Sequence, residues 1–115
     1  MTNNISGSSI ASPFVIGSNG NYQTTSDSNV ITGIDTTGDT VTLGAAYGGN
    51  AIAISGATTN NVINDSGNGD QITVDGWDFG SGNTVTESGY DAKVEFSTFK
   101  GTFACQGSRA FFTGR

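Results

Sequence analysis

A short phrase that recurs through the middle of the chain limits the folds open to it. The phrase reads GDTVTLG at residues 38–44, GNAIAISG at 49–56, GDQITVDG at 69–76 and GNTVTESG at 82–89. An Asn or Asp stands two places before a β-branched residue at short, nearly regular intervals, in the pairs Asp39/Val41, Asn50/Ile52, Asn60/Val62, Asp70/Ile72 and Asn83/Val85. Alternating apolar and polar residues, bounded by Gly, Asn and Asp, are typical of short strands joined by tight turns. The repeat therefore predicts an all-β fold.

Two arrangements of these strands fit the repeat. In a β-solenoid each strand is one side of a coil, recurring Asn side chains stack into ladders, and small residues suit the corners. In an antiparallel β-sandwich or barrel the same strands form hairpins, and Asn68-Gly69 is a hairpin signal because both residues accept positive φ. The regular Asn or Asp before each core residue is less expected in a sandwich. We therefore favour a small β-solenoid or β-roll, with the sandwich or barrel as the alternative.

Composition divides the chain into three segments. Residues 1–28, rich in Ser, Asn, Gly and Thr, predict an extended N-terminal arm; residues 29–96 form the repetitive β body; residues 97–115 predict an aromatic and basic C-terminal cap or interface segment. Only 34% of the residues are apolar, which is too few to fill a broad core. We expect thin β layers, with further apolar surface buried against another subunit.

Charge is distributed very unevenly. Residues 1–92 contain nine acids and no Lys or Arg, whereas all four basic residues lie in 93–115. An acidic body repels nucleic acid and anionic membranes, so we expect no nucleic-acid partner. No apolar segment has the length of a membrane span, and the N-terminus lacks the basic and apolar regions of a classical signal peptide.

Apolar and aromatic side chains gather near both ends of the chain. One island is Pro13–Ile16, and six of the eleven aromatic residues lie within 90–115. Aromatic residues and Arg commonly anchor interfaces, although both groups also fit an edge strand and a cap. The interface candidates are Phe14, Ile16, Phe99, Phe103, Arg109, Phe111 and Phe112. Cys105 has no intrachain partner and predicts a small buried apolar residue.

Catalytic chemistry has little support. The chain has no histidine, which removes the usual general base and the commonest metal ligand. We expect no enzyme and no cofactor, with one exception: Asp65, Asp70 and Asp75 could supply oxygen ligands to calcium, or they could cap turns. Trp77, Tyr47 and Phe79 could form a stacking surface for sugars, or Trp77 could belong to the core.

Three phrases carry a family resemblance. SNVITG at 28–33, NNVIND at 60–65 and GNTVTESG at 82–89 resemble the rungs of right-handed β-helices of phage tail fibres, virion-surface proteins and bacterial adhesins, over roughly residues 29–96. The resemblance implies a non-enzymatic, oligomeric surface role and carries over no site residues.

These observations together predict a non-enzymatic structural protein that self-associates. The role we favour is a virion surface component, either a capsid decoration protein or a fibre module, forming a homo-oligomer such as a trimer on a capsid or other surface lattice. The alternatives are a secreted adhesin or extracellular matrix fibre subunit, and a carbohydrate-binding module. The expected location is the virion surface or the extracellular space.

Overall fold

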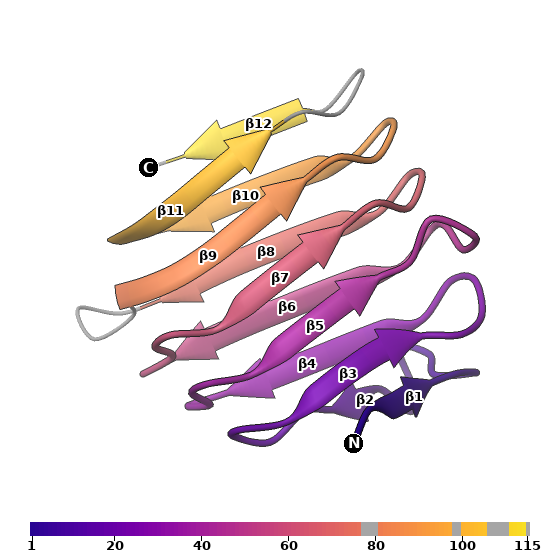
Figure 1. Cartoon of the computed structure of the whole chain (residues 1–115), viewed down its shortest axis with the longest axis horizontal. Helices are drawn as coiled ribbons and strands as arrows, with labels where there is room; N and C mark the ends of the chain where they lie inside the picture. Colours follow the sequence, from indigo (N-terminus) through magenta and orange to yellow (C-terminus); the bar gives the residue numbers. More distant parts are fainter. Residues whose placement is uncertain (77–80, 98–99, 106–110, 115) are drawn as a thin grey trace.

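The computed structural model describes residues 1–76, 81–97, 100–105 and 111–114, and they form two parallel six-stranded sheets that face each other (Figure 1). The odd sheet contains β1 (Asn3–Ile5), β3 (Asn21–Thr24), β5 (Thr40–Leu43), β7 (Val62–Asp65), β9 (Ser81–Glu87) and β11 (Lys100–Cys105). The even sheet contains β2 (Phe14–Val15), β4 (Val30–Ile34), β6 (Ala51–Gly56), β8 (Gln71–Gly76), β10 (Lys93–Ser97) and β12 (Phe111–Gly114). The all-β prediction is confirmed.

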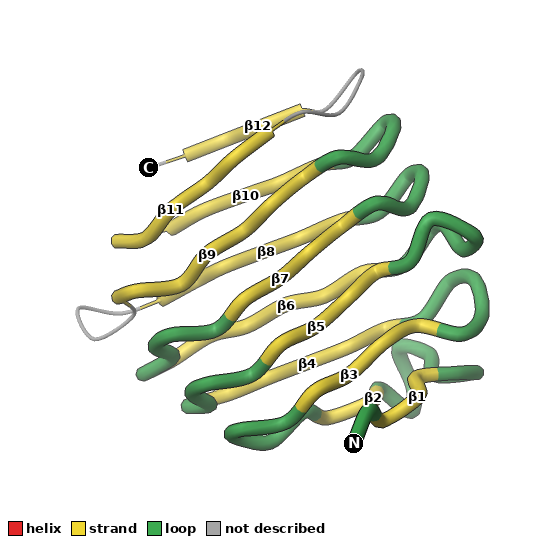
Figure 2. Tube along the Cα trace, viewed as in Figure 1, coloured by secondary structure: helices red, strands yellow, loops and turns green. Residues whose placement is uncertain are grey.

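Consecutive strands alternate between the two sheets. Each strand pairs in parallel with the strand two places further along the chain, and the connections gather along two sides of the stack (Figure 2). One coil therefore consists of one odd and one even strand. The stacking of successive coils places Val41, Ile63 and Val85 in one register column. The β-solenoid is confirmed, and the sandwich or barrel is wrong. Successive phrases lie half a coil apart, except that those at 49–56 and 69–76 are a whole coil apart on β6 and β8. Asn68-Gly69 turns the chain from one sheet to the other instead of closing a hairpin.

The core consists of apolar columns between the sheets. One column of each sheet contains Tyr22, Val41, Ile63 and Val85 (odd sheet) or Ile31, Ile52, Ile72 and Val94 (even sheet), each at most 9% exposed. Ile54 and Val74 belong to a second column of the even sheet. Because every coil needs only a few inward apolar side chains, a chain with 34% apolar residues can bury a continuous core.

One predicted register is wrong by a single residue. The sequence pairing of Asn60 with Val62 does not hold, because Ile63 is the buried residue (1% exposed) and Asn61 occupies the corner before it. Asn60 lies exposed in the turn with φ 57°. A one-residue shift reverses which side chains face the core, so burial of the larger Ile63 decides the register.

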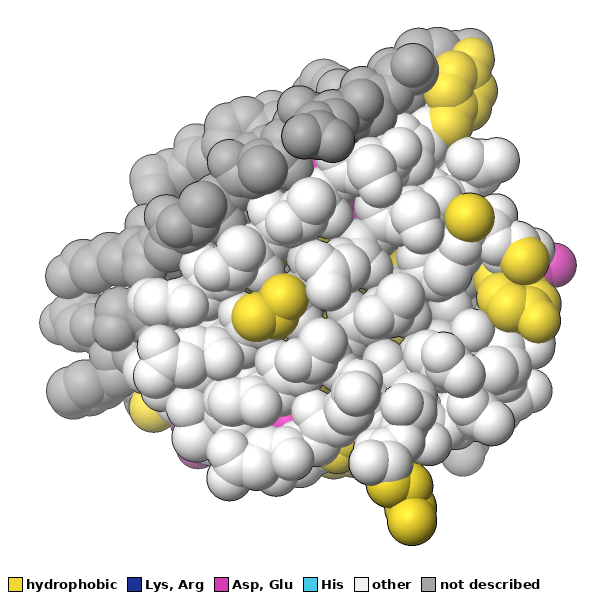
Figure 3. Space-filling view, in the orientation of Figure 1, with side chains coloured by type: hydrophobic (Ala, Val, Ile, Leu, Met, Phe, Trp, Pro, Cys, Tyr) yellow, Lys and Arg dark blue, Asp and Glu magenta, His cyan; other side chains and the backbone are white. Residues whose placement is uncertain are grey.

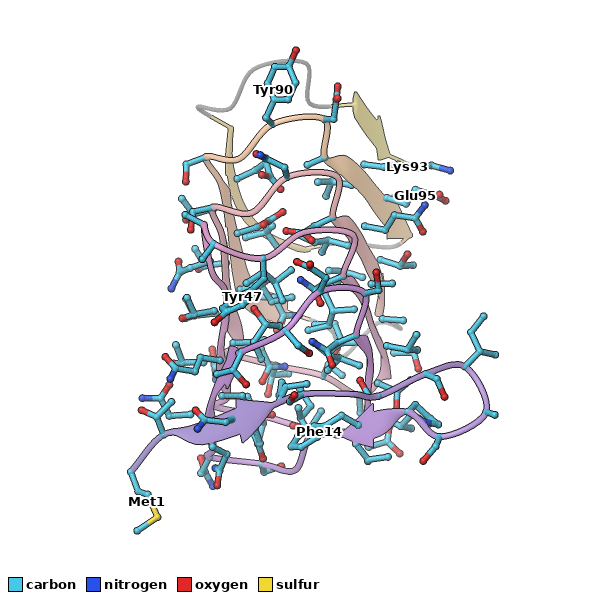
Figure 4. All side chains as sticks on the ribbon, turned by 90° about the vertical axis from the view of Figure 1, so that its right-hand side faces the viewer. Met1, Phe14, Tyr47, Tyr90, Lys93 and Glu95 are labelled. Carbon is cyan, nitrogen blue, oxygen red and sulfur yellow. The ribbon has the colours of Figure 1, made fainter. Side chains whose placement is uncertain are left out.

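The segment expected to be an arm contributes strands to both sheets. Residues 3–24 contain β1, β2 and β3, and their side chains cover the N-terminal end of the core. Phe14, labelled in Figure 4, packs edge-on against Tyr22, with ring centroids 5.8 Å apart and an interplanar angle of 77°. Ile16, only 3% exposed, occupies the space beside Gly33, where an added Cβ would come within 2.8 Å of Ile16 Cγ1. The two N-terminal interface candidates therefore contact their own chain.

The described part of the chain has no helix, and so none that is long and apolar enough to cross a membrane.

Candidate functional site

Two ladders of polar side chains line the two corners of the solenoid. We call the connections from the even to the odd sheet the amide corner, and those from the odd to the even sheet the carboxyl corner. In each ladder a backbone N–H of one coil donates to a side-chain oxygen of the next coil. These ladders account for the Asn or Asp that precedes each core residue in the sequence.

The amide corner pairs all the polar side-chain atoms of its ladder. Gly20 N donates to Asp39 Oδ1 (2.8 Å), Asp39 N to Asn61 Oδ1 (2.9 Å) and Asn61 N to Asn83 Oδ1 (3.0 Å). The side-chain amides of Asn61 and Asn83 donate to backbone carbonyls of the preceding coil (3.0 and 3.2 Å). The Thr36 hydroxyl donates to the second oxygen of Asp39. Every side-chain oxygen and nitrogen of these three rungs therefore has a partner.

The ladder of the carboxyl corner stops before the end of the stack. Ser8 N donates to Asn29 Oδ1 (3.2 Å), Asn29 N to Asn50 Oδ1 (2.8 Å) and Asn50 N to Asp70 Oδ1 (2.8 Å). The register of β8 with β10 puts Ala92 at the next rung, where the side chain has no acceptor. Asn50 Nδ2 and Asp70 Oδ2, both on fully buried side chains, have no hydrogen-bond partner.

Two further acids point into this corner from the odd sheet. Leu43, Asp65 and Glu87 are register partners on β5, β7 and β9, so the inward column changes from an apolar to an acidic residue along the stack. Asp65 is 1% exposed and Glu87 is fully buried. Asp65 Oδ1 accepts from Gly67 N (2.9 Å), and Glu87 Oε2 accepts from Gly89 N (2.9 Å). The same turn, acid-Ser-Gly, is thus made in two successive coils.

Asp65, Asp70 and Glu87 form what we call the carboxyl cluster. Burial raises the pKa of Asp65 to about 7, and its hydrogen bond to Glu87 and the Glu87 charge add to the rise, while hydrogen bonding with Asp70 opposes it. Burial also raises the pKa of Asp70 to about 8, assisted by its hydrogen bond to Asp65 and by the Asp65 charge. The backbone N–H and the side-chain amide of Asn50 act against this second rise.

No basic side chain from residues 1–92 neutralises the cluster, because that stretch has no Lys or Arg. Lys93 forms an ion pair with Glu95 (3.2 Å), and these side chains are 50% and 40% exposed (Figure 4). The atoms around the cluster are further oxygens rather than positive charges. Gly67 lies against the Asp70 carboxyl and the carbonyls of Tyr47 and Gly44, so closely that a Cβ added to Gly67 would meet the first two and come within 3.0 Å of the third. Buried carboxyls in such a setting favour the protonated form.

The predicted calcium ligands are only partly brought together. Asp65 and Asp70 share the carboxyl corner, whereas Asp75 stands near the other end of β8, in register with Ser55. Within the part of the chain that the structure describes, no set of three or more His, Cys, Asp or Glu side chains is placed to hold a metal ion. Sequence reasoning missed Glu87, and the signal that could have found it is the acid-Ser-Gly phrase at 65–67 and again at 87–89.

The other candidate residues are placed as follows. Tyr47 is partly exposed in the β5–β6 connection at the carboxyl corner (Figure 4), while Trp77 and Phe79 lie outside the described residues. Phe99 and Arg109 also lie outside them. The backbones of Phe103, Phe111 and Phe112 belong to β11 and β12, but their side chains are not among those described.

The outer faces of the two sheets differ in composition. Outward residues of the odd sheet are all uncharged among those described: Asn4, Asn21, Gln23, Thr40, Thr42, Val62, Asn64, Thr84 and Thr86 (Figure 3). The even sheet presents what we call the apolar patch, formed by Val15, Val30, Ile34, Ala51 and Ala53. Val15 and Ile34 are each 69% exposed.

Comparison with protein-family models gave no match, and comparisons with curated proteins and with solved structures gave none either.

Proposed function

We propose that the chain is a non-enzymatic structural protein that self-associates through the apolar patch of the even sheet. The observation that carries the proposal is the exposure of Val15 and Ile34, 69% each, on the face that also carries Val30, with Thr32 between them in the register. Exposed aliphatic side chains that gather on one face mark interaction surfaces more often than single ones do. Covering them with a second copy removes apolar area from water, at about 25 cal/mol per Å².

The charge distribution supports association between copies of this chain. Among the acids of residues 1–92 whose side chains are described, Asp27, Asp35 and Asp91 lie exposed in the connections, and the others are buried. The faces of β1 to β7 therefore carry no charge, so two acidic molecules can meet face to face with little repulsion.

The N-terminal end of the solenoid favours a closed oligomer over an open fibre. The edge strands β1 and β2 are only 3 and 2 residues long, and short edges disfavour pairing with further strands. The Phe14–Tyr22 pair covers the core beneath them. We therefore propose a closed homo-oligomer, such as a trimer, rather than end-to-end polymers.

The proposed setting is the surface of a virion, where the chain would act as a capsid decoration protein or fibre module. This part of the proposal rests on the resemblance of the repeated Asn-Val-Ile phrases to β-helices of virion-surface proteins. A secreted adhesin or matrix fibre, which would require open-ended polymers, is the competing role.

Size-exclusion chromatography with light scattering on the full chain tests the proposal. The wild type is expected to be a closed oligomer, and the double variant Val15→Asp/Ile34→Asp a folded monomer by circular dichroism. The matched control, Gln23→Asp/Asn64→Asp on the outer face of the odd sheet, should remain oligomeric. A monomeric wild type, or an oligomer that survives the charges at Val15 and Ile34, would rule out this interface, and growing polymers would favour the adhesin role.

A further inference from the structure

The carboxyl cluster joins two successive coils. Asp65 and Asp70 belong to the coil of β7 and β8, whereas Glu87 ends β9 in the next coil. The backbone links these coils at the same corner, where Ser88 N donates to Asp65 O (2.8 Å) and Gly69 N to Tyr90 O (2.7 Å). Any change in the charge of the cluster therefore acts directly on the contact between the coils.

The hydrogen bonds of the cluster require bound protons. Among the described residues, Asp65 Oδ2 and Glu87 Oε1 find no N–H or hydroxyl donor, and the only N–H group near Asp70 Oδ2 is the Asn50 side-chain amide, which makes no well-formed hydrogen bond. Two carboxylates cannot hydrogen-bond to each other unless one of them carries a proton. We propose that Asp65 and Asp70, packed beside Glu87, form a proton-binding site that acts as a pH-sensitive latch, closed between the two coils when protonated and opened when the site ionises.

Among the side chains that the structure describes, the groups around the site supply no alternative counter-charge. The opposing even-sheet columns, Ile52 and Ile72, are apolar, and Leu43 lies next to Asp65 in the same inward column. The other titratable groups of the neighbouring elements are Tyr47 in the β5–β6 connection, Tyr90 and Asp91 in the β9–β10 connection, Cys105 as the register partner of Glu87 on β11, and the Lys93–Glu95 ion pair on the outer face of β10. Like charges in contact without a buried cation repel strongly in a low-dielectric interior.

Loss of protons should therefore weaken the fold at this corner. The folded state binds these protons more tightly than the unfolded chain does, so its stability is fully present in acid and declines as the pH rises through neutrality. Opening would hydrate the carboxylates and release the coils that follow β8 from those before it. This proposal does not depend on self-association.

The chain contains neutral equivalents for two members of the site. Leu43 occupies the register position of Asp65 one coil earlier, and Asn50 is the rung that precedes Asp70 in the ladder. The variant Asp65→Leu/Asp70→Asn therefore copies side chains that already fit this corner. The single variant Asp70→Asn keeps the oxygen that accepts from Asn50 N. Asp39→Asn, a buried ladder acid of the amide corner, is the matched control.

The test is thermal unfolding of the full chain between about pH 5 and about pH 9, with amide hydrogen exchange of residues 65–70 and 87–92 at both limits. The wild-type midpoint should fall by roughly 10 °C as the pH rises, and the protection factors of the two turns, taken relative to the intrinsic exchange rate at each pH, should decrease. Asp65→Leu/Asp70→Asn should lose most of this fall, and Asp70→Asn part of it, whereas Asp39→Asn should retain it. A flat wild-type profile, or an undiminished fall in both cluster variants, would overturn the proposal. Loss of stability near pH 6 on adding a chelator would also overturn it, because a cation rather than protons would then neutralise the site.

Discussion

The two corners of the solenoid use the same device with different outcomes. At the amide corner Asp39, Asn61 and Asn83 pair all their side-chain polar atoms. At the carboxyl corner the ladder ends on Asp70, whose second oxygen makes no well-formed hydrogen bond and whose carboxyl adjoins Asp65. The rungs of the amide corner are thus fully paired, whereas the acids of the carboxyl corner, in the proposed latch, need bound protons to pair with one another.

The difference comes from the residues at the rungs of each ladder and in the inward column beside them. The amide corner continues from Asn61 to Asn83, so the last amide still accepts from the coil before it. At the carboxyl corner Ala92 occupies the rung after Asp70, and Glu87 is the register partner of Asp65. Substituting a ladder amide by an acid, next to a second acid in the adjoining column, is enough to convert a structural ladder into an ionisable site.

The largest effect should come from breaking the amide corner at Asn61→Ala. The change leaves Asp39 N without an acceptor and leaves the Thr36 carbonyl with only its longer bond from Thr59 N (3.4 Å). One buried unsatisfied donor and one weakened acceptor should lower the free energy of unfolding by about 3 kcal/mol. Urea unfolding should show the same loss at acid and at alkaline pH. Asn64→Ala, on the outer face of the same strand, should cost less than about 0.5 kcal/mol. A loss confined to one pH would contradict the contrast between the corners.

A smaller effect of opposite sign should come from Asp70→Asn, which makes the carboxyl corner more like the amide corner. The pKa of Asp70 is raised to about 8, so its ionisation destabilises the folded state only as the pH rises from about 4 through about 8. The variant should gain about 2 kcal/mol in free energy of unfolding near pH 9 and nothing near pH 4. Urea unfolding at several pH values measures this difference. An equal gain at both limits would mean that charge is not the cause.

The smallest effect should come from Ser8→Ala, at the first rung of the carboxyl-corner ladder. The Ser8 hydroxyl accepts from Val30 N (3.0 Å) and donates to Asn29 Oδ1 (3.1 Å), while Ser8 N keeps its own bond to Asn29. Because the site is only partly buried, water can replace the hydroxyl, and we expect a loss of about 0.5–1 kcal/mol. Chemical unfolding beside the exposed control Ser6→Ala measures the loss. A cost above that of Asn61→Ala would show that the carboxyl corner, not the amide corner, carries more of the stability.

The solenoid could be predicted because its signal is local and repeated. Alternation in TVTL and AIAI indicates strands, and the Asn or Asp before each core residue indicates a ladder. Which strands pair with each other could not be predicted from the same phrases, because the turns of hairpins and the turns of solenoid coils require similar residues. The sequence could not show whether Val62 or Ile63 faces the core, because both are β-branched and both follow an Asn at the same distance.

The candidate site was only half predictable. The sequence singles out Asp65 and Asp70 as acids near turns, but proximity in the chain groups Asp75 with them, and Asp75 stands near the opposite end of β8. Glu87 escapes sequence reasoning because it lies one whole coil from Asp65, adjacent in the structure but distant along the chain. In the same way, the sequence predicts Phe14 and Ile16 at an interface, while their burial depends on contacts with Tyr22 and Gly33.

The sequence alone determined the all-β class, the strand periodicity and the amide ladders, because these depend on residues close together in the chain. Which strands are neighbours, and which acids meet in the interior, was decided by the length of a coil, since stacking brings together residues such as Asp39 and Asn61 that are 22 positions apart. The carboxyl cluster therefore exists only once the coils have stacked. Its three acids are ordinary turn and strand residues in the sequence, and only the stacked coils deprive them of water and place them in contact.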